Sequence, residues 1–149
     1  MILRDEAGNT RSVPAPSVTI NADTVIPVVK IKLPRTAVRN TVTAWKKVLG
    51  TASDVNGTGV NTVAFRAIEK RGLSWYFYKP ATKTWVKAAT KGKAWTRSGI
   101  AVVHPSVAGA WSSQLGGLKK GTLFVRATST DKAGNVSKAV TVKAVLTAL

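Results

Sequence analysis

Short stretches that alternate between hydrophobic and polar residues recur along most of this chain of 149 residues. Gly, Pro, Asn and Thr separate them, and few segments show the helical period of about 3.6 residues. Short strands at such intervals are typical of an antiparallel sandwich or barrel. The pattern predicts an all-β fold of about seven to eight strands. The expected strands are 28–33, 41–52, 60–70, 73–79, 84–89, 109–115, 122–129 and 137–146.

The alternation also predicts which side chains face the core. Successive side chains of a strand point to opposite faces, and several of these stretches carry one apolar and one more polar set. Strands of this kind favour two antiparallel sheets packed face to face over a buried parallel sheet. The residues expected to face inward are Leu123, Val125, Ala127 and Ser129, then Val63, Phe65 and Ala67, and finally Val140, Val142 and Ala144.

Two turn sequences carry aspartates. "DVNGTG" at 54–59 and "DKAGNV" at 131–136 each join two expected strands, and their Gly and Asn residues tolerate positive φ. Asp54 and Asp131, with Asn56 and Asn135, offer oxygen ligands for calcium. The interpretation we favour is that each aspartate accepts hydrogen bonds from the backbone of its own turn, so that no metal is required.

Several motifs together resemble the immunoglobulin-like repeat of large bacterial surface and secreted proteins. The likeness covers about residues 28–146 and implies an immunoglobulin-like antiparallel β-sandwich. Its motifs are a Gly-x-Ala-x-Asp strand end, aromatic residues around a central hairpin, a Leu-x-x-Gly-Thr turn, and Arg-Ala followed by Asp-x-Ala-Gly-Asn. The matching residues are Gly50, Ala52, Asp54, Gly59, Val60, Trp75, Trp85, Trp111, Leu118, Gly121, Thr122, Arg126, Ala127, Asp131, Ala133, Gly134 and Asn135.

The N-terminus repeats the last of these motifs. "RDEAGNTRS" near the start and "TDKAGNVSK" near the end share Asp, Ala, Gly and Asn, with an offset of 126 residues between Asp5 and Asp131. The resemblance therefore implies that residues 1–24 are the terminal strand and linker of a preceding repeat, and that residues 25–149 are one sandwich domain. An unpaired strand tends to dock on a sheet edge. Val18 and Ile20 are the apolar residues expected to mediate strand addition to another molecule's sheet. The alternative, which we favour at this point, is that the segment folds back on its own domain.

The charge suggests anionic partners. The chain has 23 Lys plus Arg against six acidic residues, a formal charge of +17. Such a field attracts polyanions, among them anionic cell-wall polymer, glycan and nucleic acid. The lysines are scattered and form no basic block, which argues against specific nucleic-acid binding. No run of eighteen apolar residues is present, so we expect no transmembrane segment.

The segment 73–97 is the candidate recognition site, because aromatic residues and lysines alternate there. In the expected hairpin, Trp75 and Phe77 share one face and Tyr76 and Tyr78 the other, so only one set is expected in the core. The other set would be an exposed platform for sugar rings or bases, or else would form cross-strand pairs covered by lysine stems. The candidate ligand-binding residues are Trp75, Tyr76, Tyr78, Trp85, Lys87 and Trp95.

The sequence contains few of the residues that usually act as a catalytic acid, base or metal ligand. The single histidine, His104, has no acidic neighbour in sequence, and no phosphate loop, dinucleotide fingerprint or His-rich metal spacing occurs. We expect no enzyme, no cofactor and no catalytic or metal residue other than the calcium candidates above.

The expected role is a structural or adhesive module outside the cell, on the surface or secreted, with neighbouring repeats or copies of itself as partners. It would form an extracellular fibre if residues 1–24 add to another sheet. The alternative is a polyanion- or carbohydrate-binding module that uses residues 73–97.

Overall fold

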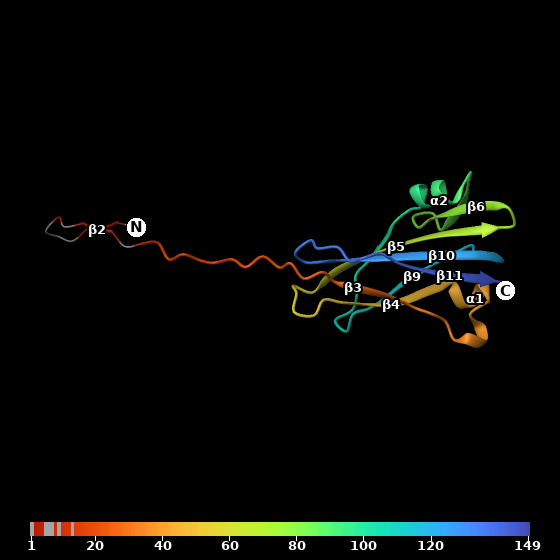
Figure 1. Ribbon diagram of the computed structural model, residues 1–149, viewed down its shortest axis with the longest axis horizontal. Helices are drawn as coiled ribbons and strands as arrows, with labels where there is room; N and C mark the ends of the chain where they lie inside the picture. Colours follow the sequence, from red (N-terminus) through yellow and green to blue (C-terminus); the bar gives the residue numbers. More distant parts are fainter. Residues whose placement is uncertain (1, 5–7, 9, 13) are drawn as a thin grey trace.

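The computed structural model describes residues 2–4, 8, 10–12 and 14–149 and confirms the predicted all-β sandwich of antiparallel sheets (Figure 1). One sheet has six strands, with β11-β10-β5-β6-β7 in order and β8 beside β5. The other has three, in the order β3-β4-β9. The strands of the sandwich are β3 (Val28–Lys32), β4 (Lys47–Ser53), β5 (Val60–Arg71), β6 (Ser74–Lys79), β7 (Thr84–Ala88), β8 (Ala101–Val103), β9 (Ala110–Gln114), β10 (Gly121–Asp131) and β11 (Val140–Leu146).

The core lies between the two sheets, where the alternation placed it. Leu123, Val125 and Ala127 of β10 are fully buried, as are Val63 and Phe65 of β5. On the inward side of the smaller sheet, Val29, Val48 and Trp111 pack against them. In β11 burial increases along the strand, from half-buried Val140 and Val142 to buried Ala144 and Leu146.

Three short helices were not predicted: η1 (Thr36–Val38), α1 (Val42–Trp45) and α2 (Lys91–Arg97). The strand predicted over 41–52 is wrong in its first part. Thr41 caps α1 by accepting a hydrogen bond from the Ala44 N–H at 3.2 Å, and Val42 and Trp45, three residues apart, both turn into the core. A one-turn helix is too short for its period to be recognised in the sequence.

Helix α2 changes how the larger sheet is buried. Thr90 caps it through the Lys93 N–H at 3.1 Å, and Ala94 then packs against Ile68, Phe77 and Ala88 on the outer face of the sheet. After α2 the chain returns to pair β8 with the first half of β5, while β6 pairs with the second half. The long β5 therefore has strands along both edges and side chains buried on both faces.

The N-terminal residues form a separate two-stranded sheet. β1 (Ile2–Arg4) pairs antiparallel with β2 (Thr10–Ser12), and Gly8 between them has φ +83°. Residues 14–22 are all exposed and belong to no strand. The chain enters the sandwich at β3 and reaches its C-terminus at the opposite end (Figure 1).

Candidate functional site

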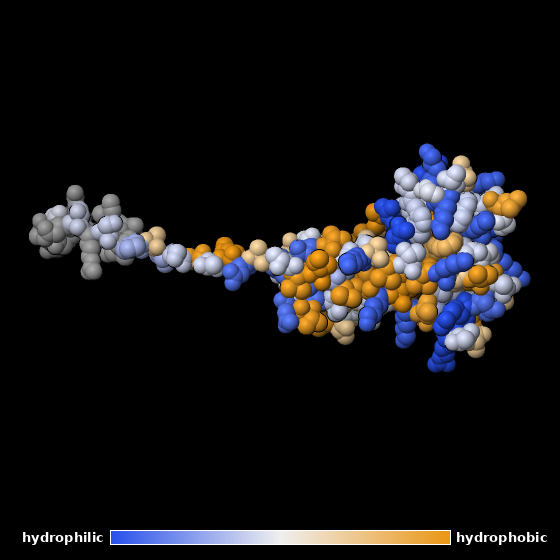
Figure 2. Space-filling model, in the orientation of Figure 1, coloured by the Kyte–Doolittle hydropathy of each residue, from blue (hydrophilic) through white to orange (hydrophobic). Residues whose placement is uncertain are grey.

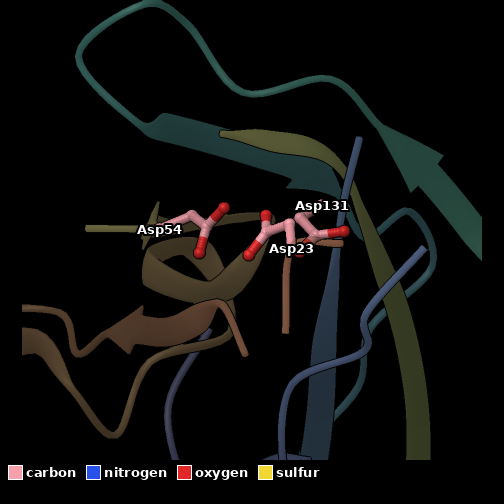
Figure 3. A group of neighbouring side chains, drawn as sticks. All are labelled: Asp23, Asp54 and Asp131. Carbon is pink, nitrogen blue, oxygen red and sulfur yellow. The ribbon is translucent and has the colours of Figure 1, made fainter. Parts of the chain in front are cut away.

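Three aspartates that are far apart in sequence meet at the end of the sandwich where the linker enters (Figure 3). Asp23 lies just before β3, Asp54 follows β4, and Asp131 is the last residue of β10. One carboxylate oxygen from each lies within 4.8 Å of the other two. Together with Asn135, these residues form what we call the linker clamp.

Asp23 attaches the linker to two loops of the domain. Its carboxylate accepts hydrogen bonds from the Val25 N–H at 2.8 Å and from the Thr58 N–H at 2.6 Å. Its carbonyl oxygen accepts a third from Asn135 Nδ2 at 2.9 Å. The backbone N–H groups of Val25 and Thr58 lower the pKa of Asp23 below its usual value, because they stabilise the ionised form.

Asp54 and Asp131 accept hydrogen bonds within their own turns. Asp54 Oδ2 accepts the Gly59 N–H at 2.8 Å. Asp131 Oδ1 and Oδ2 accept the Asn135 N–H and side-chain amide, each at 2.8 Å. This is the hydrogen bonding that turn chemistry predicts for both aspartates, although each bond spans four or five residues of the turn.

The three carboxylates of the clamp also offer oxygen ligands of the kind that bind a hard cation such as calcium. Asp54 Oδ1 is shielded from solvent and has no hydrogen-bond partner among the described residues. In the part of the chain that the structure covers, no Lys or Arg forms an ion pair with any of the three carboxylates. Asp23 was not among the calcium candidates, because only the fold brings it beside Asp54 and Asp131. The signal that could have found it is the Asp23-Thr24 pair in the segment that precedes β3.

The expectation that only one face of the aromatic hairpin is buried is wrong. Tyr78 is in the core between the sheets, where its hydroxyl accepts the Gly116 N–H at 3.2 Å. Phe77, on the opposite face, is buried beneath α2. Both faces of β6 are covered because β7 is followed by a helix that folds back over the sheet.

The remaining candidate rings are half-buried, and cations lie over most of them. Trp85 packs on Tyr78 and donates Nε1–H to Gly116 O at 2.7 Å, and the Arg71 guanidinium lies 4.5 Å from the Tyr76 ring centre. Trp75 packs on Phe124 with 5.8 Å between ring centres. The Arg126 guanidinium lies 4.1 Å from the Trp95 ring centre. Lys87 is exposed beside these rings, opposite Tyr76 on the neighbouring strand. Among the described residues, these rings form aromatic and cation–π pairs, as the cross-strand alternative predicts.

Val18, Ile20 and His104 belong to neither the clamp nor the hairpin. Val18 and Ile20 are 81% and 86% exposed. The exposed ring of His104 places Nδ1 3.1 Å from the Asn61 carbonyl oxygen. An open cleft of about 630 Å³ lies between His104 and Asp54, at the same end of the sandwich as the clamp.

Neither a scan against protein-family models nor a search of curated proteins finds a match for this chain. Among the described residues no helix is long and apolar enough to cross a membrane.

Proposed function

We propose that this chain is a non-catalytic structural and adhesive module of a bacterial surface or secreted protein, and that residues 25–149 act as one link in a row of similar sandwiches. The observation that carries the proposal is the linker clamp. It grips the incoming chain at one end of the sandwich, whereas the chain leaves at the other (Figure 1). A module built in this way transmits force along its length and holds its neighbour at a restricted angle.

The N-terminal hairpin supports a row of similar sandwiches, because it repeats the pairing between the end of β10 and the start of the connection to β11. Arg4 pairs with Thr10, and Thr130 pairs with Val136, which is the same register after the offset of 126 residues. The glycine of each turn is left-handed, with φ +83° at Gly8 and +94° at Gly134. Asp5, Ala7 and Asn9 of the first motif lie outside the described residues. This correspondence supports the proposal that β1 and β2 are the closing hairpin of a preceding sandwich.

The same offset gives a role to the exposed segment 14–20, since it aligns with β11. Val18 then corresponds to Ala144 and Ile20 to Leu146, whose side chains are 6% and 2% exposed in the core. The apolar positions of the linker are thus those that a sandwich of this type buries. In a second copy of this chain, β11 already occupies the position beside β10 that the segment would take. We therefore propose that residues 14–20 pair with a preceding module of similar fold. A fibre built by strand exchange would first have to displace β11.

The entry end of the domain has the apolar surface that a neighbour would cover. Ile26, Val55, Val107 and Val136 are each more than half exposed and lie around the clamp and its adjoining loops. Ile26 lines a groove of about 320 Å³ together with residues 27–29, Ser137, Lys138 and Val140, whereas Val55 and Val107 line the cleft of about 630 Å³. Apolar surface is visible from this end along the domain in Figure 2. Adjacent exposed apolar residues mark surfaces that other protein covers.

Substitution of Asp23 by alanine is expected to release the linker while leaving the sandwich folded. The variant loses the acceptors of the Val25 and Thr58 N–H groups, so hydrogen exchange at both amides should quicken and the NMR order parameters of residues 22–26 should fall. Because the pKa of Asp23 is lowered in the folded state, its contribution is present at neutral pH and is lost as pH falls through the folded pKa. The same loosening is therefore expected in the parent chain under strongly acidic conditions.

Two controls make the Asp23 experiment specific. Thr24→Ala, at an exposed neighbouring position, should leave both amides protected. Asp23→Asn retains one acceptor oxygen and should loosen the linker less. Unchanged order parameters in Asp23→Ala would show that the clamp does not restrict the motion of the linker. Neighbouring modules would then be joined by a flexible linker.

A second candidate function, a calcium-strengthened joint, is favoured by the buried, unpartnered Asp54 Oδ1. Three ionised carboxylates at this separation repel one another, and a cation between them removes the repulsion. Sites in extracellular modules bind calcium with a Kd of about 10⁻⁴–10⁻³ M. Calcium at ten times its Kd would add about 1.4 kcal/mol to the unfolding free energy.

The calcium site is tested by thermal unfolding with and without calcium, compared with Asp54→Asn. That variant keeps an oxygen for the Gly59 N–H and removes one charge. Stabilisation of the parent chain and a smaller gain in Asp54→Asn are the expected results. Equal curves with and without calcium would leave the hydrogen-bonded clamp as the only function of these aspartates.

The alternative function, binding of a neutral glycan by the hairpin 73–97, has less support, because Tyr78 is buried and the other candidate rings are half-buried with partners of their own. Charge-driven binding of a polyanion keeps its support from the net charge of +17.

A further inference from the structure

Three cations lie side by side on the outer face of the larger sheet. Arg66 of β5 is directly opposite Arg126 of β10 in the antiparallel register. Arg126 in turn faces Thr141 of β11, so that Lys143, opposite Phe124, is its diagonal neighbour. Side chains directly opposite have Cβ atoms about 5 Å apart, and diagonal pairs are about 7–8 Å apart. These three residues, the cation row, cross three adjacent strands.

Trp95 of α2 holds the two arginines in place. The Arg126 guanidinium lies 4.1 Å from the Trp95 ring centre, and its Nε donates to Thr141 Oγ1 at 3.1 Å. Arg66 Nη1 donates to the Trp95 carbonyl oxygen at 3.3 Å. Each guanidinium has five N–H donors, so most of the donors on both remain available. The side chains are therefore positioned before any ligand arrives.

No acidic residue that the structure describes balances this charge. Asp23, Asp54 and Asp131 are together at the linker end, and Glu69 points into the protein, where it pairs with Arg71. Like charges directly opposite each other in a sheet are destabilising. An anion bound between the arginines would turn this repulsion into attraction, and guanidinium groups bind tetrahedral oxyanions through paired N–H donors.

A fourth cation extends the row along the sheet. Lys91, at the start of α2, has its ammonium nitrogen 4.3 Å from the Phe124 ring centre, and Phe124 is the cross-strand neighbour of Lys143. The positive surface thus continues past the arginines. Because the cations are spaced along the sheet, a polymer with regularly repeated anionic groups can contact more of them than a single small ion can.

We propose that the cation row binds the sulfate or phosphate groups of an anionic polysaccharide, with Arg66 and Arg126 gripping one group and Lys143 and Lys91 the next. Nucleic acid is less suited to this surface. Single-strand binding relies on bases stacking on open aromatic faces, whereas Trp95 is covered by Arg126, and Trp75 is packed on Phe124. The site lies beside α2 on β5, β10 and β11, outside the hairpin strands β6 and β7.

The test measures binding of the full chain to heparin as the sulfated probe and to inorganic polyphosphate as the phosphate probe, with neutral dextran as the blank. We expect binding to at least one anionic probe that weakens steeply between about 50 and 200 mM salt. Arg66→Gln/Arg126→Gln should weaken it at least tenfold and reduce the slope of log K against log salt by about two. Tighter binding to one probe identifies sulfate or phosphate as the group recognised.

The matched control is Lys30→Gln/Lys32→Gln, which removes the same charge from exposed positions of β3 in the other sheet. It should change affinity less than threefold. Lys91→Gln/Lys143→Gln alters only exposed side chains, and it should weaken binding without changing the thermal unfolding of the chain.

Three outcomes overturn the proposal. Equal losses in the β3 control and the arginine variant would mean that only the overall charge attracts the polymer. Absence of binding to both anionic probes at 50 mM salt would remove the site. Tighter binding to single- or double-stranded DNA than to either probe, with the same dependence on Arg66 and Arg126, would assign the surface to nucleic acid.

Discussion

Replacement of Glu69 by alanine is expected to lower the unfolding free energy by about 3–5 kcal/mol, since it breaks a buried ion pair by removing one partner. Glu69 is fully buried in β5 and pairs with Arg71 two residues later. Its other oxygen accepts the Lys119 N–H at 3.1 Å and so ties the loop before β10 to the sheet. The alanine variant leaves that N–H and part of the guanidinium without an acceptor, and it leaves a cavity.

The balance of forces on Glu69 determines its pH behaviour. Burial raises the pKa of Glu69 above its usual value of 4.5, and Arg71 and the Lys119 N–H offset the burial only in part. For a carboxyl group with a raised folded pKa, the stability contribution is largest below the unfolded pKa and is lost as pH rises through the folded value. Glu69→Gln, which is neutral and still accepts hydrogen bonds, should therefore cost much less than alanine, and it should flatten this part of the stability profile.

The Glu69 prediction is measured by urea unfolding of the parent chain, both single variants and the double variant Glu69→Leu/Arg71→Met. Replacement of both partners by apolar residues is expected to recover most of the loss, because the charges no longer have to be desolvated. A loss below about 1 kcal/mol in Glu69→Ala would show that solvent reaches the Arg71 side of the pair.

Asp131→Ala is expected to cost about 1.5–3 kcal/mol, the range for hydrogen bonds to a charged acceptor. Asp131 is 1% exposed and accepts both N–H groups that Asn135 directs at it. Without it the turn 131–135 loses its internal support, and Asn135 loses the partner that orients its amide towards the Asp23 carbonyl. The loss should thus reach beyond the turn to the linker.

A double-variant cycle with Asn135→Ala separates the two effects. Urea unfolding should give non-additive losses, because both residues belong to one hydrogen-bond network. The amide of Val25 should exchange faster in Asp131→Ala. The matched control is Lys138→Ala at an exposed position of the same connection, with an expected change within about 0.5 kcal/mol. Additive losses and an unchanged Val25 amide would contradict the coupling of the turn to the linker.

Much of the sandwich follows from local alternation. In β10, Leu123, Val125 and Ala127 share one face in any register, so a strand built from them must bury that face. The turns were equally readable, since Gly134 adopts the positive φ that its neighbours would resist. Burial on both faces of β6 could not be predicted from the sequence, because it depends on α2. The seven residues of this helix fold back over the sheet and cover Phe77.

The candidate sites divide in the same way. The repeated Asp-x-Ala-Gly-Asn motif by itself determined the closing turn and the correspondence between residues near Asp5 and those near Asp131, because turn chemistry is local. Only the tertiary structure decided that Asp23 and Asp54 meet Asp131, and that Arg66 stands opposite Arg126. Both contacts depend on strand register and chain entry, which arise from the packing of two sheets rather than from neighbouring residues.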